Sequence, residues 1–441
     1  MLRLETMRRL DRWLGIPLCF AATWALRIAQ WLRIEPQPQS VLPARRVLFL
    51  ELSEMGSTVI ASPAMHEVQN KLNTTLFFTI FARNVESILL LQMIPTANIF
   101  VIRDDNLLTL ALDSLRFLHW TRRNKIDAIL DLELFSRYSA LLTGLSGARI
   151  RIGFHRFHAE GLYRGSMLTH PVVYNGHTHM AKNFLAMAHA LSADRRESPY
   201  AKTVIPDDRT RVATVPIHPS ETDAAHELVR QVFDDYDPRR HRIVLLNPNS
   251  SEMLPQRRWP REHFMQLANR IVSEWNDVLV AITGSAAERN ESLWMEAEIG
   301  HRRVRSLAGM HSLRMLLAIY TISDALVTND SGPAHFSALT NIPSIVLFGP
   351  ETPTLYGSLG NTESLTLGLA CSPCVTAANQ KNSACTDPVC MRMLHPEFVL
   401  QSVRRALDSQ ADNTTLASGR SATGAPNRTA LTAQAVRAPL H

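Results

Sequence analysis

The sequence lacks the short glycine-rich patterns that mark the commonest nucleotide-binding enzymes. It contains no Walker pattern and no dinucleotide-binding G-x-G-x-x-G, which disfavours an NTPase and an ordinary dehydrogenase. The longest uncharged run of its N-terminal apolar stretch ends at Leu26, short of the roughly 20 apolar residues that a membrane-spanning helix needs. Hydrophobic residues make up 46% of the 441 and charged residues 20%, which excludes wholesale disorder and predicts two or three globular domains.

Most of the chain carries no net positive charge. The 46 Lys+Arg and 40 Asp+Glu give a net charge of +6. Residues 1–46 hold eight arginines and three acidic residues, a net of +5, whereas residues 47–407 hold 35 basic and 35 acidic residues. A neutral body with a basic arm argues against a nucleic-acid enzyme, so we expect no nucleic-acid partner.

The arm, residues 1–44, has the pattern of an amphipathic helix. Thr23, Arg27 and Gln30 recur at helical spacing and are expected to form one polar stripe facing water. The apolar side chains of the other face are Phe20, Trp24, Ile28 and Trp31. Arginines combined with Trp and Leu suit a helix lying in an anionic headgroup layer, so we predict a membrane-associating arm. An uncleaved targeting segment and a helix docked on the protein's own core are the alternatives.

Between the arm and the end of the chain, short β-branched or aromatic runs alternate with helix-like segments, as in βαβ units. The runs are Val47–Leu52, Leu76–Phe81, Ile99–Arg103, Ile126–Leu132, Arg149–Phe154, Ile243–Asn247, Val278–Thr283, Ala325–Asn329 and Ser344–Phe348. They predict two doubly wound α/β domains, residues 45–215 and 216–407, with the ligand in the cleft between them at the carboxyl ends of the strands. Residues 408–441 have few large apolar side chains, and we predict a disordered tail.

Four loops at predicted strand ends have the chemistry of a binding site. They are Glu51–Ser57, Asn247–Ser251 with the following Gln256–Pro260, Thr328–His335 and Leu347–Thr352. Consecutive hydroxyls and an arginine pair suit a diphosphate, and small residues at a helix start expose backbone amides to an anion. A solvated basic turn and a simple N-cap role for Asp330 are the plain alternatives.

These loops together carry a resemblance to a known family. The motifs are Ser53-Glu-Met-Gly56, Asn247-Pro-Asn, Arg257-Arg-Trp-Pro260, Asn329-Asp-Ser-Gly-Pro-Ala-His335, Leu347-Phe-Gly-Pro350 and Cys371-Ser-Pro-Cys374. In this order, over residues 45–405, they resemble glycosyltransferase family 9, the lipopolysaccharide heptosyltransferases. The resemblance implies a GT-B fold, with an acceptor domain followed by a nucleotide-sugar domain.

The resemblance also implies an activity and a location. It implies an inverting, metal-independent transfer of a heptose-like sugar from a nucleotide sugar, in the first place ADP-heptose, to a lipopolysaccharide core or a related glycolipid. The expected partners are the nucleotide sugar, a lipid-linked glycan and an anionic membrane surface. The expected location is cytoplasmic and peripheral, on the inner face of the cytoplasmic membrane of a Gram-negative bacterium.

The family motifs and the chemistry of sugar transfer assign roles to individual residues. Transfer needs a base for the acceptor hydroxyl and a positive field for the departing diphosphate. The expected catalytic residues are Glu54, Arg257 and Asp330, with Arg257 aligned to the family's phosphate-contacting lysine. The expected donor-binding residues are Ser250, Ser251, Arg258, Glu288, Ser331, Gly332 and His335, and those on the acceptor side are Ser53, Gly56, Ser57 and Asp131.

The chain departs from the family at the position of the base. Most members carry Asp directly after the glycine of the first loop, and this chain has Ser57 there. A serine hydroxyl is a poor base, so we expect Glu54 to replace the aspartate, with Glu51 as second choice. If neither acts, the alternative function is a catalytically weak homologue that binds a sugar nucleotide or glycan. A GT-B sugar-nucleotide epimerase is a more distant alternative.

Four of the five cysteines lie within twenty residues, at Cys371, Cys374, Cys385 and Cys390. Their spacing allows a structural zinc site, although the gap before Cys390 is looser than in a zinc ribbon. No other metal is expected.

Overall fold

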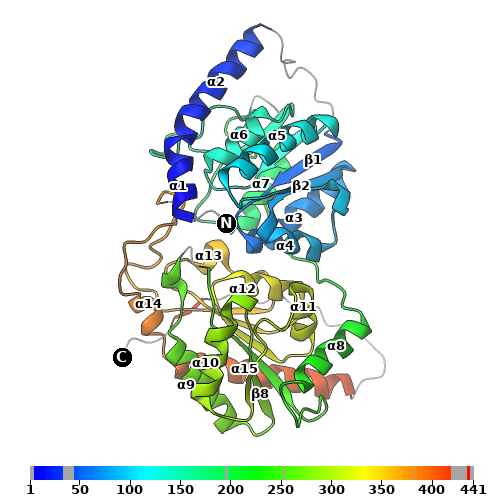
Figure 1. The fold of residues 1–441 in the computed structure, drawn as a ribbon, viewed down its shortest axis with the longest axis vertical. Coiled ribbons are helices and arrows are strands. Elements are labelled where there is room, and N and C mark those ends of the chain that lie inside the picture. Colours follow the sequence, from blue (N-terminus) through cyan, green and yellow to red (C-terminus); the bar gives the residue numbers. More distant parts are fainter. Residues whose placement is uncertain are drawn as a thin grey trace. The chain divides into compact units, whose positions relative to one another are not determined.

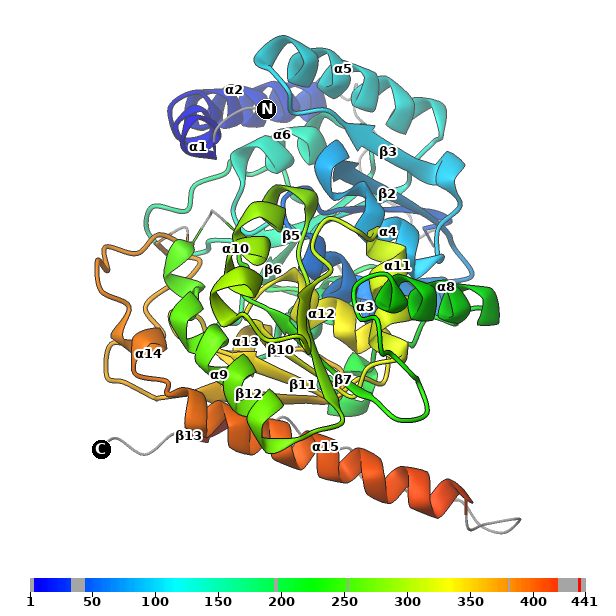
Figure 2. The same ribbon diagram turned by 60° about the horizontal axis from the view of Figure 1, so that its bottom comes forward.

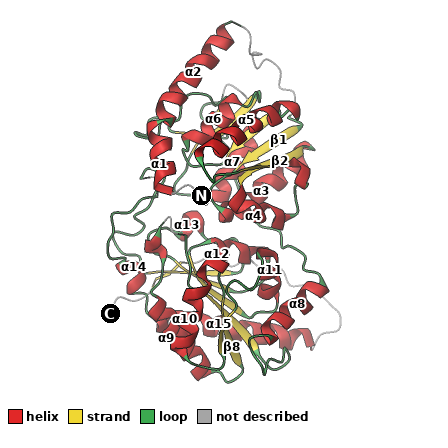
Figure 3. Cartoon of the chain, in the orientation of Figure 1, coloured by secondary structure: helices red, strands yellow, loops and turns green. Residues whose placement is uncertain are grey.

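The chain folds into two compact units, Met1–Arg211 and Val212–His441, each built around one parallel sheet (Figure 1). A computed structural model describes residues 4–32, 44–193, 197–251, 254–379, 381–418 and 435–437. Within each unit the strands are flanked by helices (Figure 3). The predicted α/β fold with two doubly wound domains is confirmed.

The sheet of the N-terminal unit has the strand order β3-β2-β1-β4-β5-β6, with every pair parallel. The strands are β1 (Arg46–Leu50), β2 (Thr75–Phe81), β3 (Ile99–Ile102), β4 (Ala128–Asp131), β5 (Ile150–His155) and β6 (His170–Val173). The helices are α1 (Leu4–Trp13), α2 (Gly15–Trp31), α3 (Met55–Leu72), α4 (Val85–Leu91), α5 (Leu107–Arg123), α6 (Arg137–Leu145) and α7 (Met180–Ala190). The short 3₁₀ helices are η1 (Ala82–Asn84), η2 (Thr96–Asn98) and η3 (Asp207–Thr210).

The strand order reverses between β1 and β4, which places the helices of this unit on two faces. The chain moves outward from β1 through α3 and α4, then returns through α5 and α6 to build the other half of the sheet. Right-handed crossovers therefore place α5 and α6 on the face opposite α3 and α4, and α7 packs beside α3. The loops after β1 and β4 flank this reversal, where doubly wound sheets bind their ligands.

The sheet of the C-terminal unit has the order β13-β12-β11-β10-β7-β8-β9, again parallel throughout. Its strands are β7 (Arg242–Asn247), β8 (Val278–Ile282), β9 (Val304–Ser306), β10 (Ala325–Asn329), β11 (Ser344–Leu347), β12 (Thr362–Thr366) and β13 (Ala435–Arg437). Its helices are α8 (Pro219–Arg230), α9 (Arg261–Glu274), α10 (Arg289–Ile299), α11 (Leu313–Thr321), α12 (Gly332–Phe336), α13 (Pro353–Tyr356), α14 (Val389–Arg392) and α15 (Pro396–Ser418), with 3₁₀ helices η4 (Pro255–Arg257), η5 (Ala286–Glu288) and η6 (Ser337–Leu339).

The core of this unit is formed by the fully buried strands and the helices beside them. Val244, Leu246, Val280 and Val327 from the strands pack with buried side chains of α9 and α15. Because α15 continues to Ser418, the predicted tail from residue 408 begins inside this helix. Most of the rest of that tail lies outside the described residues.

The N-terminal arm forms α1 and α2, and the predicted polar stripe is exposed at Arg27 and Gln30 but not at Thr23. Thr23 is buried against the unit, where its hydroxyl accepts from the Ser166 amide at 3.0 Å and donates to the Cys19 carbonyl at 2.7 Å. Thr23 is buried because α2 packs on α6 through its small side chains, which allow close contact between the helices. The large apolar side chains of α2 would keep the two helices apart. In the described part of the chain, no helix has both the length and the apolar character needed to cross a bilayer.

Candidate functional site

The loop after β1 is held in place by a carboxylate from the end of β4. Glu133 accepts from the Leu52 amide at 2.8 Å, from the Ser53 amide at 2.9 Å, and from the Ser53 hydroxyl at 2.9 and 3.0 Å. Burial raises the pKa of Glu133, and the donors on Leu52 and Ser53 oppose that rise. Glu133 therefore fixes the backbone that leads into Glu54.

Glu54 stands directly before α3, whose first turn contains Gly56 and Ser57. The Ser57 hydroxyl donates to Glu54 Oε2 at 3.3 Å, and the Glu54 amide donates to Glu51 Oε1 at 3.4 Å. Glu54 is partly exposed, whereas Glu51 is buried. The structure therefore joins the serine at the family's base position to the carboxylate predicted to replace that base.

Asp131 lies beneath this loop and has no exposed surface. Its carboxylate forms a buried ion pair with Arg164 and accepts from the Ser139 hydroxyl at 3.0 Å. Arg164 also donates to the Glu133 carbonyl at 3.3 Å. Asp131 also accepts from the Glu133 amide at 3.2 Å, so in this structure it supports the residue that holds the loop. Its predicted place on the acceptor side stays a prediction.

In the C-terminal unit, Arg257 lies between two buried carboxylates. Its Nε is 3.5 Å from Asp330 Oδ2, and its Nη2 donates to Glu351 Oε1 at 3.2 Å. Asp330 follows β10 and Glu351 follows β11, so both stand at the carboxyl edge of the sheet. The Arg257 side chain keeps 15% of its surface exposed.

The loops that carry these charges are joined by Asn329, the last residue of β10. Its Nδ2 donates to the Pro248 carbonyl at 2.9 Å, and its Oδ1 accepts from the Trp259 amide at 3.0 Å. The Trp259 indole is buried and donates to the Leu394 carbonyl at 2.7 Å. Asn329 thus holds the loop after β7 and the arginine pair that follows it against the end of β10.

The other predicted donor residues lie around this centre. Ser250 is buried, and Arg258 Nη2 donates to its carbonyl at 3.2 Å. The Ser331 hydroxyl donates to the Asn329 carbonyl at 3.2 Å, ahead of α12, which begins at Gly332. Ser251 is exposed beside Ser250, and His335 is buried within α12.

Glu288 stands after the neighbouring strand, β8, and has a structural role of its own. Its Oε2 accepts from the Ser285 amide at 2.7 Å in a capping box around η5. The carboxylate is partly exposed at the carboxyl edge of the sheet. Its predicted role in donor binding stays a prediction.

In the C-terminal unit, two residues of this cluster are missing from the predicted site. Glu351 lies in the predicted loop Leu347–Thr352 and Asn329 in the predicted loop Thr328–His335, but the sequence assigns neither a role. Their position in the sequence could have identified both residues, since each stands at or just after the end of a buried parallel strand.

The cysteine-rich segment does not form the zinc site that its spacing allows. Cys371 is exposed, Cys374 Sγ lies 3.6 Å from the Ser383 hydroxyl, and Cys385 Sγ donates to the Asp387 carbonyl at 3.1 Å. Burial, followed by the charges of the other three thiols, raises the pKa of Cys390 to about 11. Among the residues that the structure describes, no three His, Cys, Asp or Glu side chains are arranged to hold a metal ion.

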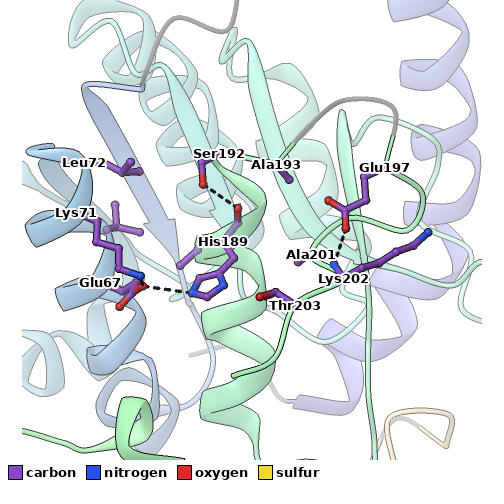
Figure 4. A pocket seen from close by; sticks show the side chains of 12 residues that line it. Glu67, Lys71, Leu72, His189, Ser192, Ala193, Glu197, Ala201, Lys202 and Thr203 are labelled. Atoms are coloured by element: carbon purple, nitrogen blue, oxygen red, sulfur yellow. Dashed lines mark hydrogen bonds and ion pairs between the residues drawn. The ribbon is translucent and has the colours of Figure 1, made fainter. Parts of the chain in front are cut away.

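A pocket of about 290 Å³ lies between the last turns of α3 and α7, away from all predicted site residues. Lys71 and His189 point toward Glu67 in it (Figure 4), with His189 Nε2 3.3 Å from Glu67 Oε1. Because α3 begins at the carboxyl edge of the sheet, its last turn lies toward the opposite edge. We therefore assign the candidate site to the strand-end loops.

Comparison with known proteins gives these loops a family context. Residues 115–384 match the family model described as glycosyltransferase family 9 (heptosyltransferase). Over 170 residues the chain is 29% identical to lipooligosaccharide heptosyltransferase 2 of Campylobacter jejuni subsp. jejuni serotype O:2, covering 38% of this chain and 51% of that protein. The chain thus spans about half the length of the curated relatives it matches first.

Solved structures share the fold over most of the chain. The structure of Escherichia coli ADP-heptose lps heptosyltransferase II has a TM-score of 0.62 at 20% identity, covering 83% of this chain and 99% of that one. E. coli heptosyltransferase WaaC with ADP has a TM-score of 0.55 at 15% identity, covering 82% and 99%. These similarities support the predicted two-domain α/β fold.

Proposed function

The chain belongs to glycosyltransferase family 9 (heptosyltransferase), and we propose that it transfers a heptose from ADP-heptose to a lipopolysaccharide core or a related glycolipid. The observation that carries the proposal is Arg257 at the strand ends of the C-terminal unit, between Asp330 and Glu351. The family match includes all the loops around it. The relatives' names supply the sugar and the acceptor, and the E. coli structure with ADP supplies the nucleotide.

We propose that transfer proceeds with inversion and that Glu54 is the base. As the acceptor oxygen bonds to the anomeric carbon from the face opposite the diphosphate, Glu54 takes the hydroxyl proton. The bond from that carbon to the diphosphate oxygen breaks, and ADP leaves with the electron pair. Support comes from the Ser57 hydroxyl, which holds the Glu54 carboxylate. Ser53 and Gly56 are proposed to line the acceptor side of this loop.

The leaving diphosphate is proposed to be stabilised by side chains and amides rather than by a divalent metal. Arg257 and Arg258 supply permanent positive charge and several donors, and hydroxyls and amides at Ser250, Ser251, Ser331 and Gly332 add to that field. Asp330 and His335 are proposed to face the donor, and Glu288 to hold its ribose. Preorganised donors of this kind are effective because they need little rearrangement as charge develops.

The proposed location is the inner face of the cytoplasmic membrane of a Gram-negative bacterium, with the protein peripheral to that membrane. Support comes from the relatives' names, since lipopolysaccharide is anchored in lipid.

Donor binding is tested by a thermal-shift panel of ADP, UDP, GDP and CMP sugars on the full chain. ADP-heptose at a hundredfold its dissociation constant is expected to stabilise the chain by about 2.7 kcal/mol. Arg257→Ala is expected to lose this shift, while Arg261→Ala, an exposed arginine on α9, keeps it. Stabilisation by a different nucleotide class would contradict the ADP assignment.

The base is tested by transfer to a purified lipopolysaccharide core acceptor. Glu54→Gln is expected to lower the transfer rate by about 10²- to 10⁴-fold while keeping the ADP-heptose thermal shift. The double variant Glu54→Gln/Ser57→Asp restores a carboxylate at the family's position and is expected to recover part of that rate. Donor binding by the wild type without any transfer supports the alternative, a catalytically weak sugar-nucleotide-binding homologue.

A further inference from the structure

The outward side of α2 carries a stripe of exposed large apolar side chains. Phe20, Trp24, Ile28 and Trp31 are 58%, 49%, 52% and 82% exposed. Their spacing of four, four and three residues places them on one face of the helix. Such a row of aromatic and aliphatic side chains on a protein surface marks an interaction site.

The opposite side of α2 is fixed to the N-terminal unit by small residues. A Cβ added at Gly15 would lie 2.7 Å from Cβ of Arg137, at the start of α6. One added at Gly165 would lie 2.8 Å from the Thr23 hydroxyl. Cys19 is buried in the same contact. Close packing of this kind sets the rotation of α2, so its apolar stripe faces away from the protein.

Helix α1 fixes the arm at a second point. The Asp11 carboxylate accepts from the amides of Arg137 and Tyr138 at 2.8 and 2.9 Å, and from Arg137 Nη1 at 3.1 Å. These amides belong to the first turn of α6, where a carboxylate is favoured. The arm is therefore a docked part of the unit.

A second apolar stripe runs along α5. Leu108, Leu112 and Leu115 are 70%, 45% and 66% exposed and lie on one helix face. Helices α5 and α6 share one face of the sheet, and α2 packs on α6, so the two helices that carry the stripes belong to the same side of the unit (Figure 2). Sequence periodicity predicted the stripe on α2 but not the one on α5.

The exposed ionised side chains on α2 and α5 themselves are arginines, whereas the exposed Asp105 stands two residues before α5. Helix α2 contains no acidic residue, and its Arg27 guanidinium lies over the Trp24 ring, 5.5 Å from the centroid. On α5 the only acidic residue, Asp113, is buried and paired with both Arg103 and Arg116. Exposed arginines beside tryptophans suit the headgroup region of an anionic bilayer, where the ring is half immersed and the guanidinium meets phosphate.

We propose that Phe20, Trp24 and Trp31 of α2 and Leu108, Leu112 and Leu115 of α5 form a docking surface that lies on an anionic lipid bilayer. The occupant is a bilayer because the apolar stripes are bordered by positive charge and carry tryptophans at the level where water meets hydrocarbon. The proposal deepens the proposed peripheral location, on which it rests, by naming the surface that meets the membrane. It does not depend on the proposed transfer, since it needs neither nucleotide nor acceptor.

Docking on this surface also bears on the acceptor loop. The segment that receives Thr23 contains Arg164, whose guanidinium pairs with Asp131 beneath the loop after β1. The residues that hold α2 and those that support the loop are therefore adjacent in one buried network. Binding through α2 fixes the orientation of this loop with respect to the bilayer surface.

The test is sedimentation of the full chain with vesicles, without nucleotide. Wild type is expected to bind vesicles of phosphatidylcholine with phosphatidylglycerol at least tenfold more tightly than vesicles of phosphatidylcholine alone. Phe20→Ser/Trp24→Ser/Trp31→Ser is expected to lose at least tenfold of this affinity, and Leu108→Ser/Leu112→Ser/Leu115→Ser several-fold. All six side chains are largely exposed, so both variants should keep the wild-type melting temperature.

The matched control is Leu89→Ser/Val204→Ser, which removes exposed apolar side chains outside the docking surface. It is expected to bind vesicles as wild type does. Wild-type binding by the α2 variant overturns the proposal, as does equal binding of the wild type to both vesicle types. If the wild type does not bind vesicles but self-associates, and the α2 variant loses this self-association, the surface binds a second copy of the chain. That result also overturns the bilayer proposal. Each variant is also tested for the ADP-heptose thermal shift. A variant that loses vesicle binding but keeps this shift shows that membrane docking and donor binding fail independently.

Discussion

At the scale of single residues, the positive charge of Arg257 is shared between two carboxylates before any ligand arrives. A diphosphate bound there has to be attracted by a guanidinium that Asp330 and Glu351 already partly neutralise. Arg258 and the backbone amides are therefore expected to carry a large part of the attraction.

Removing one of these negative charges should strengthen nucleotide binding. Glu351→Gln keeps an oxygen that can accept from Arg257 but carries no charge, so ADP is expected to bind about three- to tenfold more tightly, or about 1 kcal/mol. Isothermal titration calorimetry at fixed ionic strength measures this change. Glu262→Gln, a carboxylate on the exposed side of α9, is the control and should leave the affinity unchanged. Weaker binding by Glu351→Gln would show that Glu351 positions Arg257 more than it neutralises it.

The sequence could identify site residues whose contacts are with neighbours a few positions away along the chain. Glu54 and Ser57 stand three positions apart in one turn, and their contact follows from that spacing. The burial of Asp131 was not predictable, because its partner Arg164 comes from a segment 33 residues later that has no regular pattern. The rotation of α2 about its axis, which turns its apolar stripe outward, was likewise not predictable, because it depends on the contact of Gly15 with α6.

At the scale of secondary structure, strands with a continuous apolar run were predictable, including β3 at a sheet edge, and strands without such a run were not. All nine predicted apolar runs form strands, because a parallel strand buried on both faces requires continuous apolar side chains. The strands missed are β6, β9, β12 and β13, which lie at or next to the edges of their sheets. β6 contains a proline, β9 has three residues, and β12 reads Thr-Glu-Ser-Leu-Thr, so none has an apolar run.

Attachment of α8 to α11 is expected to depend on pH through Glu221. Its carboxylate accepts from Arg314 Nε and Nη2, both at 2.7 Å, and from the His218 amide at 2.9 Å. These partners, Arg314 first, lower the pKa of Glu221 to about 2. Since the folded pKa is below its ordinary value of 4.5, the stabilisation is present above about pH 4.5 and is lost as the pH falls toward 2.

Glu221→Gln is expected to lower the stability of the C-terminal unit by about 1–2 kcal/mol at pH 7, through loss of a charged cap and a bidentate pair. The difference in melting temperature from the wild type should stay constant from pH 7 to 5 and narrow below about pH 4.5. Glu227→Gln on the same helix removes an exposed pair with Arg230 and should have little effect at any pH. A constant Glu221→Gln difference down to pH 3 would contradict the assigned pKa.

At the scale of the whole molecule, the chain has two separately packed cores. The N-terminal core includes Leu48, Phe117 and Ile129, and the C-terminal core includes Val244, Trp259 and Val327. Each unit encloses its own sheet and is large enough to fold around it. The proposed donor residues all belong to the C-terminal unit. ADP binding is therefore expected to raise the free energy of unfolding of that unit.

ADP should therefore protect the two sheets unequally against hydrogen exchange. At a hundredfold its dissociation constant, the slowest amides of β7 and β10 are expected to exchange about a hundredfold more slowly, because they exchange through unfolding of the unit that binds ADP. Amides of β1 and β4 should exchange at unchanged rates. Hydrogen-exchange mass spectrometry with and without ADP measures both sets in one sample, and Arg257→Ala provides the control without donor binding. Equal protection of β1 and β4 would mean that the two cores unfold as one cooperative unit, since ADP bound to one unit can slow exchange in the other only if their unfolding is coupled.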